Sequence, residues 1–373
     1  MPYAHSRREF IRLASIGSLA VAGGSLLRTG ARAEVRPPEA GARKLGVALL
    51  GLGSYSTSEL APALQQTRLC RLAGVVTGSP AKAAKWARKY NLPKKNLYHY
   101  DHLEQIANNP DIDIVYVVTP PALHPEFAIR AAKAGKHVIS EKPMACSLAD
   151  CDAMIAACRD AGVKLSVGYR LHFDPYHQEL MRLAGDPGFG PLTRMNGELS
   201  FTMYGKQWRA ERRLAGGGPM MDLGIYVVHG ACMAAGGATP LAVTAHEEPK
   251  TRPEFFKDVE ESMQWTMAFP NGAVCRASSS FARGGNHFRA EGPHGWIEFP
   301  ENAFLYRNIG CVTSRGPLRF EPPVSQQARQ MDHFADCILT GRATPVPGEL
   351  GRRDIRILSA IYEAASTGKR IVV

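Results

Sequence analysis

The sequence lacks the patterns that mark several large protein classes. Its eight cysteines form no C-x-x-C pair, and none stands beside a histidine at metal-ligand spacing, so no metal site is expected. No internal repeat or low-complexity tract is found, which argues against solenoids, coiled coils and disordered chains. Basic residues are scattered and not interleaved with aromatics, so nucleic acid is not an expected partner. What is present is a chain of 373 residues with 45% hydrophobic and 21% charged residues, a globular composition long enough for two domains.

Long apolar runs are missing too, except for one near the N-terminus. Arg7 and Arg8 precede an apolar stretch from Leu13 to Leu27, and residues 31–33 (Ala-Arg-Ala) form a small-x-small cleavage pattern. The stretch is too short for a bilayer, which takes about 20 residues. We interpret residues 1–33 as a twin-arginine signal peptide; an ordinary secretory signal or an uncleaved anchor is the alternative. The signal predicts export of the folded protein to the periplasm, with no stable membrane insertion after cleavage.

Apolar runs and helical patterns alternate along the first part of the mature chain. Residues 34–44 form a polar, proline-bearing arm, after which an apolar run enters a glycine turn. Strand-like and helix-like segments then follow one another, which predicts a parallel, doubly wound Rossmann domain over residues 45–165. The expected helices cover residues 56–66, 79–90, 123–135 and 147–162.

The pattern changes after residue 165. Several segments alternate apolar and polar residues with period two, separated by Gly or Pro, while helical patterns appear only near 222–235 and 327–340. A final amphipathic helix and a short strand close the chain. We predict an α+β domain over residues 166–373 with a large, mostly antiparallel open sheet, and a final helix able to pack back on the first domain. The predicted fold class is therefore α/β.

The first expected strand leads into a candidate dinucleotide site. Gly51 permits a tight turn, and Gly53 lets the backbone approach a pyrophosphate at the start of the next helix, with Ser54 and Tyr55 in the same loop. Ser56 stands where a third glycine is usual, and a lone G-x-G also fits an ordinary glycine turn. Its place after the first strand of an alternating domain favours the cofactor interpretation.

The end of the second expected strand bears on which dinucleotide binds. NAD-binding domains usually carry Asp or Glu there for the ribose 2′-hydroxyl. This chain has Thr77 and Ser79, with Lys82 three residues on. A hydroxyl and a lysine suit a 2′-phosphate, so the sequence favours NADP(H), although Lys82 can also be simply a solvated helix residue.

Two further loops follow strands at the edge where doubly wound sheets bind ligands. One carries Thr119, Pro120 and His124, and the other carries Glu141 and Lys142. All are assigned to the cofactor cleft. A salt-bridged structural pair of Glu141 and Lys142 is the alternative.

A glycine-rich loop precedes a helix that carries an acid, a phenol and an imidazole. At 100° per residue, Tyr226 lies 40° from Asp222, and His229 lies about 20° from Asp222 in the other direction, so all three are expected on one face. Such groups can move protons. The alternative is a core helix with a polar lining, which is strongest for His229.

These segments together resemble a known family. The stretches "VYVVTPPALHPEFAIRAAKAGKHVISEKPMA", "VGYRLHFDP", "QWRAERRLAGGGPMMDLGIY" and "IYEAASTGKRIVV" are similar to the glucose–fructose oxidoreductase branch of the Gfo/Idh/MocA family. The resemblance implies NADP(H) in the first domain and a sugar against the second domain's sheet. It places Lys142 and Tyr226 at the reacting carbon, Asp222 alongside, and Arg170, Trp208 and Arg209 near the cleft.

The resemblance also implies a reaction. We expect a periplasmic sugar oxidoreductase with tightly bound NADP(H), which oxidises an aldose at C1 to its lactone and reduces a second sugar carbonyl to an alditol. Tyr226 would move the proton, assisted by the Lys142 ammonium. A single-direction sugar dehydrogenase or reductase with exchangeable cofactor, and a non-catalytic nucleotide- or glycan-binding protein, are the alternatives. Small-molecule sugars and a homodimer or homotetramer through the C-terminal sheet are the expected partners.

Overall fold

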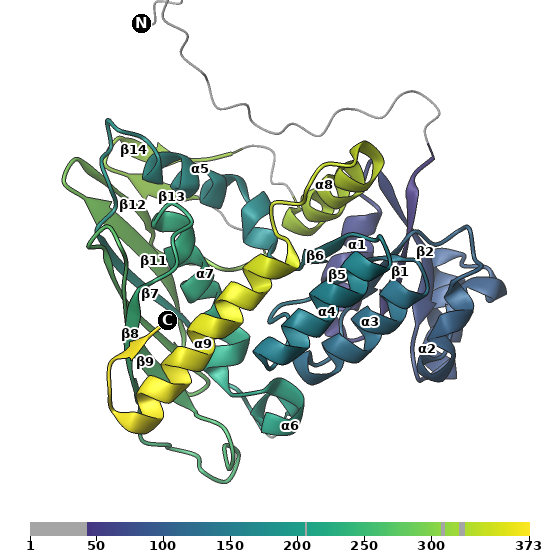
Figure 1. Ribbon diagram of the computed structural model, residues 1–373, viewed down its shortest axis with the longest axis horizontal. Helices are drawn as coiled ribbons and strands as arrows, with labels where there is room; N and C mark the ends of the chain where they lie inside the picture. Colours follow the sequence, from purple (N-terminus) through teal and green to yellow (C-terminus); the bar gives the residue numbers. More distant parts are fainter. Residues whose placement is uncertain (1–42, 206, 307–309, 321–324) are drawn as a thin grey trace, which may run out of the picture. The chain divides into compact units, whose positions relative to one another are not determined.

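The computed structural model describes residues 43–205, 207–306, 310–320 and 325–373. The expected signal peptide and all but the last two residues of the expected arm lie outside these ranges. Within the described residues the strands form two sheets, one of six strands and one of nine, with helices packed against both (Figure 1). The α/β class predicted from the sequence is confirmed.

The first sheet is the expected Rossmann sheet. Its order is β3-β2-β1-β4-β5-β6, and all the strand pairs of the sheet in the described residues are parallel. This is the doubly wound order that binds dinucleotides. All six residues of the first strand are buried, as expected for a strand covered on both faces. The strands are β1 (Leu45–Leu50), β2 (Cys70–Val76), β3 (Leu97–Tyr98), β4 (Ile114–Val117), β5 (His137–Ser140) and β6 (Leu165–Val167).

Local signals explain where the helices of this domain begin and end. In α2 the Ser79 side chain accepts the Lys82 N–H, Pro80 takes the first position, and Asn91 ends the helix in a left-handed conformation. The helix expected from Ser56 differs, because a π-helical turn, Ser56–Leu60, comes before the α-helix proper. The helices are α1 (Ala61–Leu64), α2 (Pro80–Tyr90), α3 (His124–Lys133) and α4 (Leu148–Asp160).

The second sheet is mostly antiparallel, with the order β14-β13-β12-β11-β7-β10-β9-β8-β15. Among its strand pairs in the described residues, only β7–β10 is parallel. Buried and exposed residues alternate along β7, as the period-two pattern predicts. The strands are β7 (Arg194–Ser200), β8 (Ala242–Glu247), β9 (Ser262–Ala268), β10 (Val274–Ser280), β11 (Gly285–Gly292), β12 (Gly295–Phe299), β13 (Cys311–Thr313), β14 (Gly316–Leu318) and β15 (Ile371–Val372).

Helices cover one side of this sheet, as Figure 1 shows for α5, α7 and α9. The sequence did not predict α5, although Asp174 caps it, Pro175 takes its first position, and Leu180 and Leu183 are buried on its inner side. The other helices are α6 (Arg212–Ala215), α7 (Ile225–Ala234), α8 (Gln326–Thr340) and α9 (Gly348–Thr367), with α5 spanning Pro175–Ala184. Among the described helices, none is long and apolar enough to cross a membrane.

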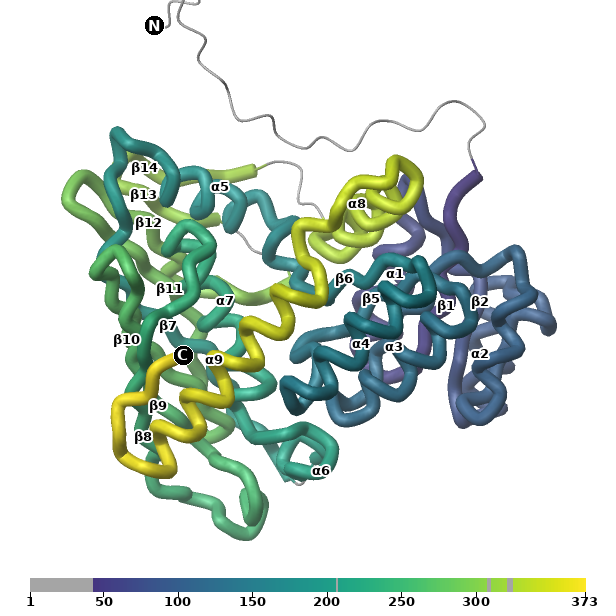
Figure 2. Tube along the Cα trace, viewed as in Figure 1, coloured from purple at the N-terminus to yellow at the C-terminus, as the bar shows by residue number. Residues whose placement is uncertain are grey.

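The last two helices return to the first domain. α9 contacts α4 and β6 of the first domain as well as β8 and α7 of the second. α8 contacts α1 and β2, and Figure 2 shows the path of both helices. The missing side chain of Gly351 permits this packing, because a Cβ there would lie only 2.7 Å from Met144 Sδ. The C-terminal helix thus joins the two domains, as the sequence suggested.

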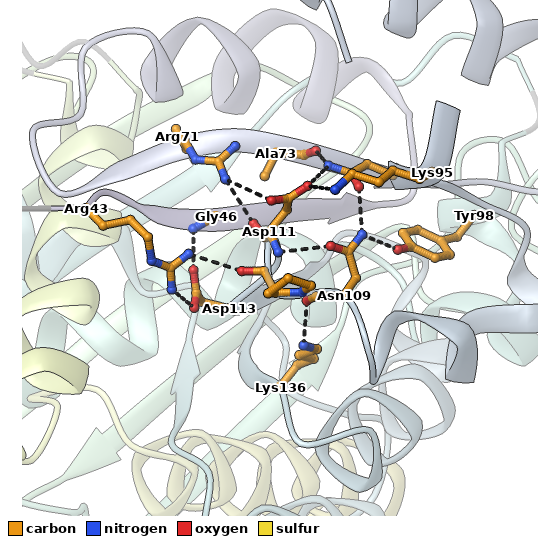
Figure 3. Close-up of polar contacts among 12 residues, drawn as sticks. Arg43, Gly46, Arg71, Ala73, Lys95, Tyr98, Asn109, Asp111, Asp113 and Lys136 are labelled. Atoms are coloured by element: carbon orange, nitrogen blue, oxygen red, sulfur yellow. Dashed lines mark hydrogen bonds and ion pairs between the residues drawn. The ribbon is translucent and has the colours of Figure 1, made fainter. Parts of the chain in front are cut away.

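A polar network closes the amino-terminal edge of the Rossmann sheet (Figure 3). Asp113, just before β4, accepts hydrogen bonds from Arg43 at 2.6 Å and from the Gly46 N–H at 2.7 Å. Nearby, Asp111 pairs with Lys95 at 2.7 Å, and Asn109 Nδ2 donates to Tyr98 Oη at 2.6 Å. The network fixes the start of β1 at the edge of the sheet opposite the glycine loop.

Candidate active site

The glycine loop lies at the carboxyl edge of the first sheet. Gly51 adopts φ +96°, and a Cβ there would lie 2.5 Å from the Val118 carbonyl oxygen, so only glycine fits. Gly53 is exposed, and a Cβ there would meet nothing within 4 Å, which leaves its backbone open to a ligand. In place of a third glycine, the buried Ser56 hydroxyl donates to the Gly51 carbonyl at 2.6 Å and closes the turn.

The residues assigned to a 2′-phosphate lie beside this loop. The Ser79 hydroxyl accepts the Lys82 N–H at 3.3 Å as the cap of α2, and Lys82 Nζ donates to the Leu52 carbonyl at 3.5 Å. The ammonium therefore reaches the glycine loop itself. Ser79 and Lys82 are near each other and near the loop, at the carboxyl end of β2.

A cavity of about 460 Å³ opens between the carboxyl edge of the first sheet and the second domain. Most of the predicted site residues line it. From the first domain these are Gly53, Ser54, Tyr55, Thr119, Pro120, Glu141 and Lys142, and from the second they are Arg170, Trp208, Arg209, Asp222 and Tyr226. Gly51, Ser79, Lys82 and His124 do not line it.

Lys142 is the centre of the cavity's polar contacts. Its ammonium donates to the Asp222 carbonyl at 2.8 Å, lies 3.6 Å from the Asp222 carboxylate, and sits 4.4 Å from the centre of the Tyr226 ring. The lysine pairs with Asp222 of the second domain, so the alternative of a structural pair with Glu141 is not what the structure shows. Lysine, carboxylate and phenol are thus gathered at one point of the cavity wall.

Asp222 is held ionised by two cations. Burial opposes the charge of its carboxyl, but Lys142 and Arg209 outweigh that effect and hold the pKa of Asp222 below its ordinary value. Arg209 Nε donates to the carboxylate at 2.9 Å, and the guanidinium lies 4.5 Å from the centre of the Trp208 ring. The carboxylate therefore fixes both cations in the cavity wall.

The expectation that His229 shares a face with Asp222 and Tyr226 is wrong. His229 is buried away from the cavity, with Nδ1 2.7 Å from the Asp354 carboxylate and its ring stacked on Tyr169 at 4.0 Å. Asp222 belongs to a π-helical turn, Met220–Gly224, that precedes α7. A π turn has more residues than an α turn, so spacing at 100° per residue does not carry across it.

His124 has a different place from the one predicted. Its ring nitrogens lie 3.0 Å from the Pro143 carbonyl oxygen and 2.8 Å from the Thr119 carbonyl oxygen, so it ties the two ligand-facing loops together from behind. Burial lowers the pKa of His124 to about 4. It supports the cleft and does not line it.

Glu141 anchors its loop from the first domain. Tyr116 Oη donates to the Glu141 carboxylate at 2.7 Å and accepts from Gln330 of α8 at 2.8 Å. Burial raises the pKa of Glu141 above its ordinary value, against the effect of the Tyr116 hydrogen bond. The loop before Lys142 is therefore tied to α8.

Sequence reasoning missed several residues of the cavity. Their sequence positions lie far from every motif, on β7, on β11 and after β12, and only the pairing of the second sheet brings them in. Aromatic residues there include Phe201, Phe304 and Tyr306, and Asn286 adds an amide. The Asn286 side-chain oxygen accepts the Phe304 N–H at 2.9 Å, which fixes this wall.

The residues present fit a nicotinamide dinucleotide. Thr119 Oγ1 is buried at the cavity without a hydrogen-bond partner among the described residues, which is expected where a polar ligand completes the bonding. Gly53 offers an open backbone, and Lys82 stands at the end of β2. The fold and this cavity together define an oxidoreductase with a dinucleotide-binding domain and a separate substrate domain.

The family follows from comparison with known proteins. Residues 45–169 match the oxidoreductase family with an NAD-binding Rossmann fold, Gfo/Idh/MocA, and residues 177–298 match the C-terminal domain of the same family. The chain belongs to the Gfo/Idh/MocA family. The predicted family and a nicotinamide-dependent oxidoreductase activity are therefore confirmed.

Individual relatives cover most of the chain. The structure of aldose-aldose oxidoreductase from Caulobacter crescentus complexed with glycerol is 41% identical, with a TM-score of 0.85 over 89% of this chain and 100% of that one. The D-xylose 1-dehydrogenase [NADP(+)] of Haloarcula marismortui is 26% identical over 330 residues, 86% of this chain and 91% of that protein. The 1,5-anhydro-D-fructose reductase of Ensifer adhaerens is 28% identical over 287 residues, 72% of this chain and 81% of that protein.

Proposed function

We propose that this protein is a periplasmic sugar oxidoreductase that holds NADP(H) and exchanges a hydride between two sugars. The observation that carries the proposal is the cluster of Lys142, Asp222 and Tyr226 in the same cavity as the open glycine loop. Similarity over nearly the whole chain to an aldose-aldose oxidoreductase supports it.

NADP(H) is the proposed cofactor. The second strand ends in Thr77 with no acid after it, and Lys82 reaches the glycine loop. A relative that covers most of the chain is a D-xylose 1-dehydrogenase named for NADP(+). Both points favour a dinucleotide that carries a 2′-phosphate.

When bound, a nicotinamide would supply the two-electron hydride chemistry that links the oxidation of one sugar to the reduction of the other. In the oxidation, the Tyr226 phenolate takes the proton of the sugar C1 hydroxyl as the C1–H bond breaks, and the lactone carbonyl forms. In the reduction, the same phenol returns the proton to the carbonyl oxygen of the second sugar, which becomes an alditol. Lys142 holds the reacting oxygen and assists the proton transfer, and Asp222 keeps Lys142 in place.

The compartment explains why two sugars are needed. The proposed signal peptide, residues 1–33, exports a folded protein, and the periplasm offers no useful pool of free NADP(H). An enzyme exported with its cofactor must recycle that cofactor on a second substrate. We further propose that two or four copies assemble through the open face of the second sheet, which light scattering of the purified protein tests.

The decisive experiment is incubation of purified protein with pairs of sugars and no added cofactor. We expect lactone and alditol in equal amounts, measured by chromatography, and no product from Tyr226→Phe. Product that forms only when NADP⁺ or NADPH is added would favour the single-direction dehydrogenase. Absence of product under every condition would favour a binding protein.

A further inference from the structure

Arg170 is a buried guanidinium in the cavity wall, between two phenol rings. It is 2% exposed, and its central carbon lies 4.8 Å from the centre of the Tyr226 ring and 4.6 Å from that of Tyr306. The 3₁₀ turn Arg170–Phe173, directly after β6, carries it to the cavity. The turn directly after the last strand of the first sheet thus supplies a cation to the Tyr226 phenol.

The groups that hold this guanidinium are neutral. Its NH1 group donates to the Leu305 carbonyl at 3.1 Å and to Gln326 Oε1 at 2.5 Å, and its NH2 group donates to the Phe304 carbonyl. Nε is buried without a partner among the described residues. Both terminal nitrogens are already engaged by the protein, so Arg170 is poorly suited to the cofactor-binding role predicted from the sequence.

Lys142 and Arg170 are unlike in one respect. Both lie within 5 Å of the Tyr226 ring, but Lys142 is paired with the Asp222 carboxylate, whereas none of the hydrogen-bond partners of Arg170 carries a charge. Burying a cation without a counterion is costly. Burial opposes its charge, yet the neighbouring phenols, Tyr226 first, hold the pKa of Arg170 above its ordinary value.

We propose that Arg170 is a positioning residue whose guanidinium charge stabilises the phenolate of Tyr226 during proton transfer. The inference rests on the proposed function of Tyr226. Arg170 touches neither sugar nor cofactor in this role. The charge it answers is the negative charge that forms on the phenol oxygen when that group becomes the base. The Tyr306 ring also lies against the guanidinium, and the buried Glu141 carboxylate interacts with its charge.

Other charged and titratable groups also face Tyr226 and enter the test. They come from the glycine loop, from the loop after β5, from the turn before its own helix and from the segment after β12, and they are Tyr55, Glu141, Lys142, Asp222 and Tyr306. None of them changes in the variants below. A shift in the ionisation of Tyr226 can therefore be assigned to Arg170.

The test compares Arg170→Met, Arg170→Lys and the control Gln326→Met. Gln326 does not line the cavity, so its removal loosens the anchor of the guanidinium while the charge stays. Ionisation of Tyr226 is followed by NMR of ring-labelled tyrosine over a pH series, with Tyr226→Phe identifying the signal. Reduction of bound NADP⁺ by an aldose is followed by stopped flow over the same series.

In Arg170→Met we expect the Tyr226 midpoint to rise by about one pH unit or more, because a cation within 4–6 Å typically shifts an acid by 1–3 units. Hydride transfer at neutral pH should slow by about 10–100-fold and recover at higher pH. Arg170→Lys and Gln326→Met should each keep the midpoint within about half a unit of wild type.

A purely structural role predicts another result. If Gln326→Met raises the midpoint as far as Arg170→Met, or if Arg170→Met slows transfer equally at every pH, the proposal is wrong. Should Arg170→Met not fold, a midpoint in Arg170→Lys raised by a unit or more overturns it as well. The NMR titration needs no turnover. If no sugar reacts, the proposed function is wrong, but the titration still shows whether Arg170 shifts the ionisation of Tyr226.

Discussion

The Tyr362 hydroxyl of α9 donates a 2.8 Å hydrogen bond to the buried carboxylate of Glu260. The same carboxylate accepts the N–H groups of Gly218 and Met220, each at 3.0 Å. Glu260 therefore holds the loop from which the turn bearing Asp222 begins. The position of the proposed catalytic cluster depends in this way on a side chain that lies outside the cavity.

Glu260→Gln should lower both stability and turnover. A glutamine offers one acceptor oxygen, so at least one buried N–H of the loop loses its partner, at a cost of about 1–3 kcal/mol in the free energy of unfolding. Tyr362→Phe removes one hydrogen bond and should cost about 0.5–1.5 kcal/mol. Urea unfolding and steady-state rates measure both, and equal rates for Glu260→Gln and wild type would refute the positioning role.

Lys142→Ala should reduce turnover by about 10²–10⁴-fold, the usual contribution of a group that assists proton transfer. The fold and the nucleotide content should change little, since Asp222 keeps its 2.9 Å contact with Arg209. Lys133→Ala, an exposed lysine of α3, is the control. Rates are measured on sugar pairs, and a loss of less than about threefold would mean that Lys142 is structural.

Tyr226→Phe should slow the oxidation and the reduction alike, because one phenol serves as base in one and as acid in the other. Sugar binding should weaken by only about 0.5–1.5 kcal/mol, one hydrogen bond. His229→Gln should lower stability, since Asp354 loses one of its partners and keeps Arg353, and leave hydride transfer near wild type. Stopped-flow reduction of bound NADP⁺ measures hydride transfer in both variants. Fast transfer in Tyr226→Phe with slow transfer in His229→Gln would make His229 the base.

Lys82→Ala should weaken binding of NADP(H) by about 10–100-fold and leave NAD(H) binding unchanged, because a charged hydrogen bond to phosphate contributes about 1.5–3 kcal/mol. Lys85→Ala, exposed on the same helix, is the matched control. Nucleotide released by denaturation is identified by mass, and affinities come from titration of emptied protein. Predominant NAD(H) in wild-type protein would contradict the 2′-phosphate role of Lys82 and Ser79.

His124 should make the protein sensitive to acid. Burial lowers its pKa from 6.5 to about 4, so the folded state favours the neutral ring. The stability is fully present above pH 6.5 and is lost as the pH falls towards about 4, because the unfolded chain takes up the proton first. The loss amounts to roughly 3 kcal/mol. Urea unfolding across this range should show a smaller pH dependence in His124→Gln, and no change in the exposed control His99→Gln.

The sequence predicted the Rossmann domain well because its signals are local: each strand ends in a loop at the same edge of a parallel sheet. Thr119, Lys142 and the glycine loop could therefore be brought together without coordinates. The antiparallel sheet offered no such rule. Phe201, Asn286 and Tyr306 meet only through strand pairing across long sequence separations, and no motif marks them.

Two errors have identifiable physical causes. The face assigned to His229 assumed α-helical spacing through Met220–Gly224, where the chain makes a π turn. His124 was placed in the cleft because it follows a strand end, but both of its ring nitrogens lie against carbonyl oxygens of the loops. Sequence position gives the edge of a sheet on which a residue lies, and not the direction of its side chain.

The ion pair of Arg43 with Asp113 has a practical consequence for work on this enzyme. It fixes the start of the described chain at the amino edge of the Rossmann sheet, whereas the glycine loop lies at the far end of β1, six residues or about 20 Å away. A reporter or affinity tag fused ahead of Arg43 would begin on the side away from the nucleotide loops. Cytoplasmic production with such a fusion in place of the proposed signal peptide should therefore leave cofactor loading intact.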